Sequence, residues 1–261
     1  VHVGDVAPLQ PGATELADPD ALTGVTGLPD ALRGRRYALA LVNYAFCTGC
    51  LAGVDADLTV LETHDRFANR HDVLAVAGCE PSWIALTVAA EARAAARVDL
   101  LGVVREDDRA HFEALGANAV AMLRPMEWRQ RSAEGTLARR GGAIRLGFVG
   151  SYNAVNAQAL RALLRAVAAR RGELGRFELH VLGRVCETLG PEERALSIPH
   201  GIVESRDDLY DRFDVLLNPT VSGTGVKIKT IEALAFGKPV MCCAEGAAGL
   251  PDVPPFMRLP S

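Results

Sequence analysis

Two lysines and a glutamate follow a glycine-rich stretch in residues 223–232, GTGVKIKTIE. The glycines would let the backbone approach a ligand closely, because they carry no side chain and accept positive φ. A helix beginning near Gly225 or Val226 would point unpaired N–H groups at that ligand. Lys227 and Lys229 would then lie in the first turn, where the helix dipole disfavours cations unless an anion is bound. The stretch therefore predicts a phosphate or diphosphate site.

Glu232 is the carboxylate of the same predicted helix. It follows Val226 by six residues, or about 9 Å along the axis at about 1.5 Å per residue, which suits the separation of a diphosphate from a ribose. A carboxylate accepts hydrogen bonds from both hydroxyls of a vicinal diol. The alternative is a surface helix whose charges are merely solvated. The Gly-Thr-Gly loop and the turn at 237–240 make that alternative the weaker one.

Two other predicted strand ends carry residues that suit a phosphate. At Gly150 and Ser151 a strand gives way to a polar turn containing Asn153 and then to a helix N-terminus. Capping of that helix by Asn153 or Asn156 explains the same residues equally well, and the glycine spacing does not fit the dinucleotide fingerprint. Arg184 follows another strand, and its guanidinium suits phosphate oxygens. A plain surface arginine is an equal alternative.

His64 follows a predicted strand in the first half of the chain, within LETHDRFANR. An imidazole there could donate to a sugar hydroxyl or take part in proton transfer, and a purely structural histidine is an equal alternative. Cys47 and Cys50 have the spacing of a redox or zinc motif, but no second pair accompanies them in the sequence. We therefore favour small residues near a strand end as the explanation of that pair.

Strands and helices alternate along most of the chain. In the first half, strands are expected at 37–42, 58–61, 100–104 and 118–123, and helices at 84–96 and 107–115. In the second half, strands are expected at 144–149, 177–182, 201–203, 214–217 and 239–242, and helices at 156–170 and 207–212, besides the helix of Glu232. This alternation is typical of an α/β fold with parallel sheets.

The polar, Arg-rich segment 129–143, which ends in Gly-Gly, interrupts the alternation and is the predicted linker. It separates an N-terminal Rossmann-like domain, 1–128, from a C-terminal domain, 144–261. Ligands of such sheets bind beyond the carboxyl ends of the strands, so we expect the domains to face a cleft. The first strands of the first domain are expected to be absent, or to come from the weakly patterned residues 1–36.

The composition is that of an ordinary globular protein, with 49% hydrophobic and 23% charged residues among 261. A formal net charge of −4 argues against a general nucleic-acid-binding protein. No apolar run reaches the roughly 18 residues of a membrane helix, so any membrane contact would be peripheral. Scattered cysteines in a chain of this size favour a reducing, cytoplasmic compartment.

The segment DLYDRFDVLLNPTVSGTGVKIKTIEALAFGKPVMCCAEGAAGL resembles the donor-binding segment of retaining GT-B glycosyltransferases of the glycosyl transferases group 1, or family 4, kind. RLGFVGSYNAVNAQALRALL is similar to the start of the same donor domain. LETHDRFANR and EARAAARVDLLGVVREDDRAHFEALGA are similar to parts of the first domain. The resemblance covers about residues 57–250.

The resemblance implies two Rossmann-like domains with parallel sheets, and transfer of a sugar from a nucleoside diphosphate sugar to an acceptor hydroxyl with retention of configuration. Glu232 would bind the ribose. The diphosphate and sugar would be held by Gly223, Thr224, Gly225, Val226 and Lys229, with Gly150, Ser151 and Asn153 nearby. Lys227 and Arg184 would stabilise the leaving group, and His64 would approach the donor sugar. No metal and no further cofactor is implied, because cationic side chains and a helix dipole take that task.

Many relatives carry another glutamate eight residues before the ribose-binding one, where this chain has Thr224, so recognition of the donor sugar is altered. The family's first glycine-rich loop and its final crossover helix are not visible in the sequence, as expected for a fragment of a longer enzyme. One alternative is a nucleotide-sugar epimerase of the same fold, which needs further acid/base carboxylates. Another is a non-catalytic nucleotide-sugar-binding module. The acceptor, whether glycan, lipid or small molecule, stays open.

Overall fold

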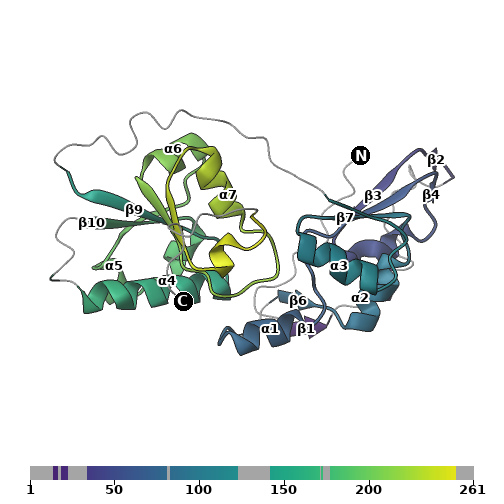
Figure 1. The fold of residues 1–261 in the computed structure, drawn as a ribbon, viewed down its shortest axis with the longest axis horizontal. Helices are drawn as coiled ribbons and strands as arrows, with labels where there is room; N and C mark the ends of the chain where they lie inside the picture. Colours follow the sequence, from purple (N-terminus) through teal and green to yellow (C-terminus); the bar gives the residue numbers. More distant parts are fainter. Residues whose placement is uncertain are drawn as a thin grey trace. The chain divides into compact units, whose positions relative to one another are not determined.

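A computed structural model describes residues 14–16, 19–22, 34–80, 83–122, 142–170, 172 and 177–250. The chain divides into two compact units (Figure 1). The N-terminal unit comprises Val1–Pro125 with Thr224–Val226, and the C-terminal unit comprises Met126–Gly223 and Lys227–Ser261. Of the predicted linker 129–143, all but the last two residues lie outside the described ranges.

The C-terminal unit is built on a five-stranded sheet of order β11-β10-β9-β12-β13 in which every pairing is parallel. Its strands are β9 (Ile144–Val149), β10 (Phe177–Leu182), β11 (Ile198–Gly201), β12 (Val215–Asn218) and β13 (Val240–Cys242). The chain runs outward from β9 to β10 and β11, then crosses to β12 and β13 on its other side. Open α/β sheets bind ligands at the carboxyl ends of the strands where the order reverses in this way.

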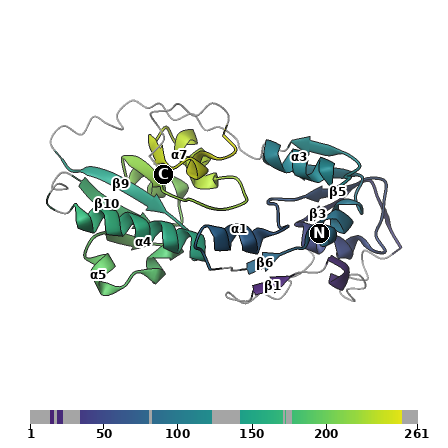
Figure 2. The same ribbon diagram turned by 60° about the horizontal axis from the view of Figure 1, so that its bottom comes forward.

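Helices cover both faces of this sheet (Figures 1 and 2). On one face, α4 (Ala154–Ala169) buries Leu160 and Leu164 in a cluster with Phe148 of β9. On the other face lie α6 (Arg206–Asp211) and α7 (Ile228–Ala235), whose buried residues pack with Leu216 of β12. Short helices η4 (Arg184–Thr188), α5 (Pro191–Arg194) and η5 (Glu245–Ala247) complete the described part. Strands buried on both faces read as apolar runs in the sequence.

The N-terminal unit contains a four-stranded parallel sheet of order β3-β5-β7-β8. Its strands are β3 (Ala40–Asn43), β5 (Thr59–Glu62), β7 (Leu100–Val103) and β8 (Val120–Met122). Its helices are α1 (Arg70–Val76), α2 (Val88–Ala95) and α3 (Glu106–Ala114), with η1 (Pro19–Leu22) and η3 (Ala45–Leu51). Two short parallel pairs join β1 (Thr14–Leu16) to β6 (Trp83–Ala85) and β2 (Arg36–Tyr37) to β4 (Asp55–Ala56).

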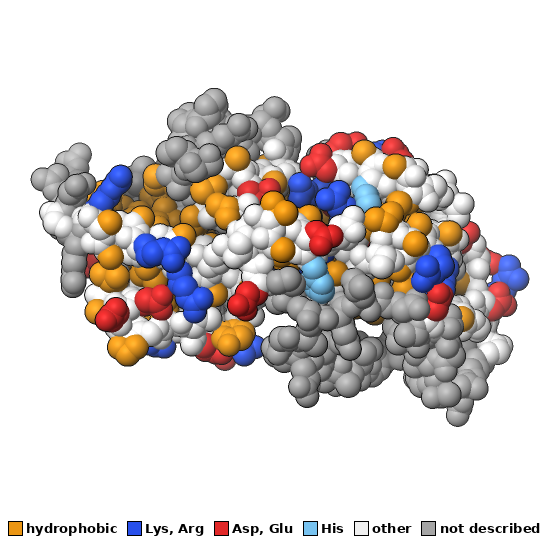
Figure 3. All heavy atoms as spheres, turned by 90° about the horizontal axis from the view of Figure 1, so that it is seen from below, with side chains coloured by type: hydrophobic (Ala, Val, Ile, Leu, Met, Phe, Trp, Pro, Cys, Tyr) orange, Lys and Arg blue, Asp and Glu red, His pale blue; other side chains and the backbone are white. Residues whose placement is uncertain are grey.

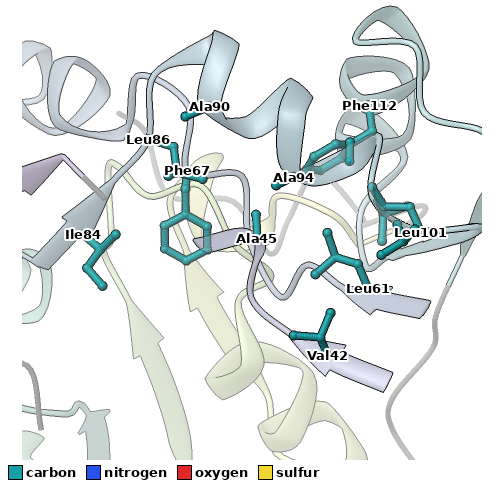
Figure 4. Packing of buried hydrophobic residues seen from close by; sticks show 13 residues of the cluster. Val42, Ala45, Leu61, Phe67, Ile84, Leu86, Ala90, Ala94, Leu101 and Phe112 are labelled. Atoms are coloured by element: carbon teal, nitrogen blue, oxygen red, sulfur yellow. The ribbon is translucent and has the colours of Figure 1, made fainter. Parts of the chain in front are cut away.

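One hydrophobic cluster holds this unit together (Figure 4). Leu61 of β5 and Leu101 of β7 lie against Phe112 of α3, and all three are almost fully buried. Ala94 of α2 is also buried in the cluster, and a small residue at that point lets the helix pack close to the sheet. The carboxyl ends of β3 and β5, where His64 follows, are fixed by this packing.

The structure corrects part of the predicted element pattern. The expected helix 84–96 is wrong at its start, because residues 83–85 form β6 and α2 begins only after its N-cap, Thr87. β6 pairs with β1, a partner far away in sequence that local periodicity does not reveal. β1 also shows that the weakly patterned residues 1–36 supply a strand. The helix α1 and the first short strands were not expected.

Candidate functional site

The turns after β9 and β10 are joined directly. The Gly150 N–H donates to the Leu182 carbonyl, and the Val185 N–H donates to the Gly150 carbonyl. Gly183 has a φ of 90°, and a Cβ at that position would lie 2.3 Å from the Gly150 carbonyl oxygen. Position 183 therefore requires glycine, because the ends of β9 and β10 approach each other closely there. This close approach fixes the Gly150–Ser151 turn.

Gly183→Ala is expected to lower the free energy of unfolding by about 2–4 kcal/mol, because the positive φ and the overlap with a backbone oxygen both oppose a side chain. Urea unfolding of the variant and the wild type measures the difference. Gly172→Ala is the matched control: a Cβ there meets nothing within 4 Å, and its effect should stay within about 0.5 kcal/mol. Equal stability of all three proteins would contradict the packing described here.

The helix α4 begins at Ala154, and Asn153 is its N-cap. The Asn153 Oδ1 accepts from the Asn156 N–H at 2.8 Å, and its Nδ2 donates to the Ser151 Oγ at 3.0 Å. The capping interpretation is therefore confirmed for Asn153 and wrong for Asn156. The predicted donor-binding role of Gly150, Ser151 and Asn153 stays a prediction, and these residues form the turn in front of the α4 N-terminus.

The helix α7 begins at Ile228, later than expected, and Lys227 is its N-cap residue. The expected start near Gly225 or Val226 is wrong because the backbone still departs from helical values at Lys227, where ψ is 71°. Gly223 has a φ of 131°, a value that favours glycine. Thr224, Gly225 and Val226 group with the N-terminal unit, and their predicted contacts with the donor stay predictions.

Lys229 lies in the first turn of α7, and its ammonium is enclosed by α4 and β9. The Nζ donates to the Asn156 Oδ1 at 2.6 Å and lies 5.3 Å from the centroid of the Phe148 ring. Burial, and then the positive charge of Lys227, lower the pKa of Lys229 from 10.5 to about 8. Among the described residues, Lys229 forms no ion pair with a carboxylate, and a poorly hydrated ammonium gains strongly from a nearby anion.

Lys227 is only 8% exposed and forms an ion pair with the Glu245 carboxylate at 2.7 Å. Its Nζ also donates to the Gly223 carbonyl at 3.4 Å. Glu245 lies in η5, after β13. Our expectation that the lysine charges are left for a bound anion to balance is therefore wrong for Lys227, which has a counter-ion in the protein itself.

Glu232 has two neighbours in α6, the buried Tyr210 and the exposed Arg206. Its Oε2 accepts from the Tyr210 hydroxyl at 3.0 Å, and its Oε1 lies 3.4 Å from the Arg206 Nη2. The Glu232 side chain is 18% exposed, so the interpretation as a solvated surface carboxylate is wrong. Neither Tyr210 nor Arg206 was predicted to contact Glu232, and Asn156 was predicted only as a helix cap, because nothing in local spacing links these residues to α7.

A buried polar network fixes α7 against the end of β12. The Asn218 Nδ2 donates to the Thr230 Oγ1 at 2.8 Å, and the Thr230 hydroxyl donates to the Gly246 carbonyl at 2.8 Å. Asn218 and Thr230 are almost fully buried, and a satisfied buried network rigidifies the elements that it joins. The network thereby fixes α7, which carries Lys229 and Glu232, at the end of β12, one of the two strands at the switch point of the sheet.

Arg184 opens η4 directly after Gly183, which contacts the Gly150 turn. Its guanidinium is exposed, pairs with Glu187 at 3.1 Å within the same turn, and lies 5.7 Å from the Tyr152 ring. A phosphate role for Arg184 would require that it exchange Glu187 for the ligand. That role and the surface alternative both stay open.

His64 belongs to the N-terminal unit and follows β5. Its ring lies against that of Tyr44, with centroids 4.5 Å apart and planes tilted by 33°, and its Nε2 lies 2.8 Å from the Asn43 Oδ1. Both His64 and Tyr44 have positive φ, 56° and 69°. Such backbone costs about 1–3 kcal/mol at non-glycine residues and concentrates at functional sites. The expected approach of His64 to the donor sugar stays a prediction.

Cys47 and Cys50 lie in η3 and pack against the core of the N-terminal unit. Burial raises the pKa of Cys47 to about 11 and also raises the pKa of Cys50. Thiols that keep their protons are poor nucleophiles and poor metal ligands. The structural explanation of the pair is therefore favoured over the redox one.

The charge distribution on the surface and the length of the helices concern two kinds of partner, nucleic acid and membrane. Basic and acidic side chains are interspersed over the described part of the face in Figure 3. Among the residues that the structure describes, no helix is both long and apolar enough to cross a membrane.

Residues 143–254 match the sequence profile of the family described as glycosyl transferases group 1. The matched range contains β9, α4 and α7, and with them Lys227, Lys229 and Glu232. The chain has no significant match among curated protein sequences.

Several solved structures share the fold. A UDP-forming α,α-trehalose-phosphate synthase from Burkholderia xenovorans superposes with a TM-score of 0.58 at 14% identity, over 80% of this chain and 60% of that one. The α,α-trehalose 6-phosphate synthase from Burkholderia multivorans gives 0.57 at 15% identity, over 88% and 61%. HepE from Anabaena, solved in complex with UDP and glucose, gives 0.56 at 13% identity, over 82% and 60%. The chain thus spans about 60% of the length of these structures.

Proposed function

We propose that the chain transfers a sugar from a nucleoside diphosphate sugar to an acceptor hydroxyl, with retention of configuration. The GT-B fold of the chain and the match of residues 143–254 to the profile of glycosyl transferases group 1 support this proposal. One observation carries the proposal. An ammonium with no ion-pair partner among the described residues, Lys229, and a largely buried carboxylate, Glu232, lie on one helix, α7, which follows the switch-point strand β12 of a parallel sheet.

The donor fits this arrangement part by part. The diphosphate would lie at the N-terminus of α4 and beside Lys229, where helix N–H groups and a poorly hydrated cation favour negative charge. The ribose would lie at Glu232, which is three residues past Lys229 and therefore nearly one helical turn further along α7. HepE, which shares the fold, was solved with UDP and glucose.

The chemistry would depend on stabilising the leaving group. The bond between the anomeric carbon and the diphosphate oxygen breaks, and the acceptor oxygen bonds to the same carbon. Negative charge builds up on the departing diphosphate, where Lys229, Lys227 and the helix N-termini would be placed to stabilise it. His64 would act on the sugar from the N-terminal unit. In this scheme side chains and dipoles supply the positive charge, so neither a metal nor a further cofactor is required.

Glu232→Ala is expected to weaken binding of the nucleoside diphosphate sugar by about 10- to 150-fold, because hydrogen bonding to a charged group contributes about 1.5–3 kcal/mol. Titration calorimetry with the wild-type protein and the variant measures the change. Glu192→Ala, an exposed glutamate of α5, is the matched control and should bind like the wild type. Equal affinity of Glu232→Ala and the wild type would exclude the ribose assignment.

A panel of UDP-, GDP- and dTDP-sugars distinguishes this function from its rivals. Release of nucleoside diphosphate that depends on an acceptor supports transfer. Interconversion of the sugar without release would indicate an epimerase, and binding without turnover would indicate a non-catalytic module. The acceptor class and a cytoplasmic location stay predictions.

A further inference from the structure

We propose that Tyr210 is a positioning residue of the nucleotide site: its hydroxyl holds the Glu232 carboxylate in the orientation that receives the two ribose hydroxyls. The proposal rests on the proposed function, because it assigns a role to Tyr210 through the ribose contact of Glu232. Tyr210 itself touches no ligand in this scheme.

The ring of Tyr210 is held by α7 itself. It stacks on Phe236, the C-cap residue of α7, with centroids 4.5 Å apart and planes 18° from parallel, and it meets Phe213 edge-on at 5.6 Å. Tyr210 is 1% exposed. Phe236 is four residues after Glu232, about one helical turn. The hydroxyl is therefore placed relative to the same helix that carries the carboxylate.

In the hydrogen bond between Tyr210 and Glu232, the phenol is always the donor. Burial, and then the negative charge of Glu232, raise the pKa of Tyr210 far above its ordinary range. The phenol therefore keeps its proton and donates at 3.0 Å to the Glu232 Oε2. A hydrogen bond to an ionised acceptor is stronger and more directional than one between neutral groups.

The count of lone pairs leaves room for the ribose. A carboxylate offers about four acceptor positions, and Tyr210 takes one of them on Oε2. Two hydroxyls of a vicinal diol can occupy two of the remaining positions. The orientation of the carboxylate plane decides whether both hydroxyls reach it at once, and a carboxylate held by a buried donor does not have to give up rotational freedom when the diol binds.

Arg206 offers a comparison on the same carboxylate. Its guanidinium lies 3.4 Å from the Glu232 Oε1, but its side chain is 72% exposed. Exposed ion pairs contribute little free energy, and salt screens the attraction between their charges. The buried contact from Tyr210 and the exposed contact from Arg206 should therefore differ in their effect on ligand binding, although both come from α6.

A role in packing alone would look different. Tyr210 also belongs to the buried cluster between α6, α7 and the sheet, so its loss could disturb binding of any ligand. A positioning role acts only through Glu232. It should concern only ligands that carry ribose hydroxyls, and it should vanish when Glu232 is absent.

The experiment is a double-mutant cycle measured by titration calorimetry. The proteins are the wild type, Tyr210→Phe, Glu232→Ala, the double variant and Arg206→Ala. The probes are UDP or GDP, whichever the wild type binds, and the 2′,3′-dideoxy form of the same diphosphate. Phenylalanine keeps the ring and its stacking, and thermal unfolding of each variant verifies that it is folded.

We expect Tyr210→Phe to weaken binding of the ribonucleotide by about 3- to 10-fold, since the variant loses a hydrogen bond to a charged group without losing the carboxylate itself. Its affinity for the dideoxy form should change by less than about 2-fold, as should the ribonucleotide affinity of Arg206→Ala. In the Glu232→Ala background the tyrosine substitution should have no further effect.

Three results would overturn the positioning role: unchanged ribonucleotide affinity in Tyr210→Phe, an equal loss for both probes, or the same loss without Glu232. The wild type gives a test that does not depend on any variant, because equal affinity for the two probes would remove the ribose contact and Tyr210's role with it. If the wild type binds neither diphosphate, the proposed function has failed first. If the wild type prefers the ribonucleotide to the dideoxy form and Tyr210→Phe keeps the same preference, the positioning role is excluded but the proposed function is not.

Discussion

Lys229→Met is expected to lower sugar transfer by about 10²- to 10³-fold, the loss seen when one preorganised group that stabilises developing charge is removed. Methionine has a similar length and can lie against Phe148, but it offers no charge to the leaving diphosphate. Turnover is measured as nucleoside diphosphate released from the nucleotide sugar in the presence of an acceptor.

The same substitution is expected to raise the free energy of unfolding at pH 7, by about 1–2 kcal/mol. Burial that lowers the pKa of Lys229 to about 8 is a cost of keeping the ammonium charged in the folded protein, and methionine does not bear it. The loss of the hydrogen bond to Asn156 offsets part of the gain. Urea unfolding at fixed pH measures the difference.

Lys238 provides the matched control. It is also a buried lysine of the C-terminal unit, but its Nζ donates to the Phe213 carbonyl at 3.1 Å, at the start of β13 rather than at the strand ends that form the site. Lys238→Met should keep turnover within about 3-fold and should be less stable than the wild type, because a buried carbonyl loses its donor. If Lys229→Met also kept turnover, the leaving-group role of Lys229 would be excluded.

The affinity of the wild type for a nucleoside diphosphate is expected to fall about 50-fold between pH 8 and pH 10. The pKa of Lys229 is about 8 in the ligand-free protein, and a bound anion raises it, since opposite charge favours the ammonium. Binding therefore takes up a proton above pH 8, and the affinity falls up to tenfold per pH unit. The phosphate itself is fully ionised in this range, with a second pKa near 6.

Calorimetry in two buffers of different ionisation enthalpy checks the proton uptake directly. Lys229→Met should bind weakly with a nearly flat profile over the same range. The groups facing Lys229 are Lys227 on its own segment, Asn156 from α4 and Phe148 from β9. A wild-type affinity that stays constant from pH 8 to pH 10 would contradict the assignment of the anion to Lys229.

Rising pH has opposite effects on the two quantities: it lowers the affinity for the diphosphate but raises the contribution of Lys229 to the free energy of unfolding. The folded-state pKa of Lys229 lies below its ordinary value, so the unfolded chain binds more protons between about pH 8 and about pH 10.5. The contribution of Lys229 to stability therefore rises with pH through that window. The stability gap between Lys229→Met and the wild type should close over the same window.

The sequence predicted the parts of the fold that are encoded by local pattern. The strands 144–149 and 177–182 have the expected bounds, because a strand buried on both faces is an uninterrupted apolar run. The positions of Lys229 and Glu232 on one helix follow from the 3.6-residue period. Helix ends were less certain, since the start of α7 depends on the backbone at Lys227 rather than on composition.

The contacts of the site residues were not predictable in the same way. Tyr210 and Glu232 are 22 residues apart, and Asn156 and Lys229 are 73 apart. Glu245, which pairs with Lys227, follows β13 in the chain, so a helix and a strand separate the two residues in sequence. Each pairing depends on how strands from separate parts of the chain line up in the sheet, and periodicity within one segment carries no information on that alignment.

In the proposed function, the ion pair between Lys227 and Glu245 would make donor binding an exchange of partners. A phosphate that reaches Lys227 has to displace a carboxylate that already neutralises it, so the gain on binding is smaller than for a bare cation. After transfer, Glu245 can take Lys227 back as the diphosphate departs. We expect this contact to weaken retention of the spent diphosphate and so to hasten the clearing of the site for the next donor.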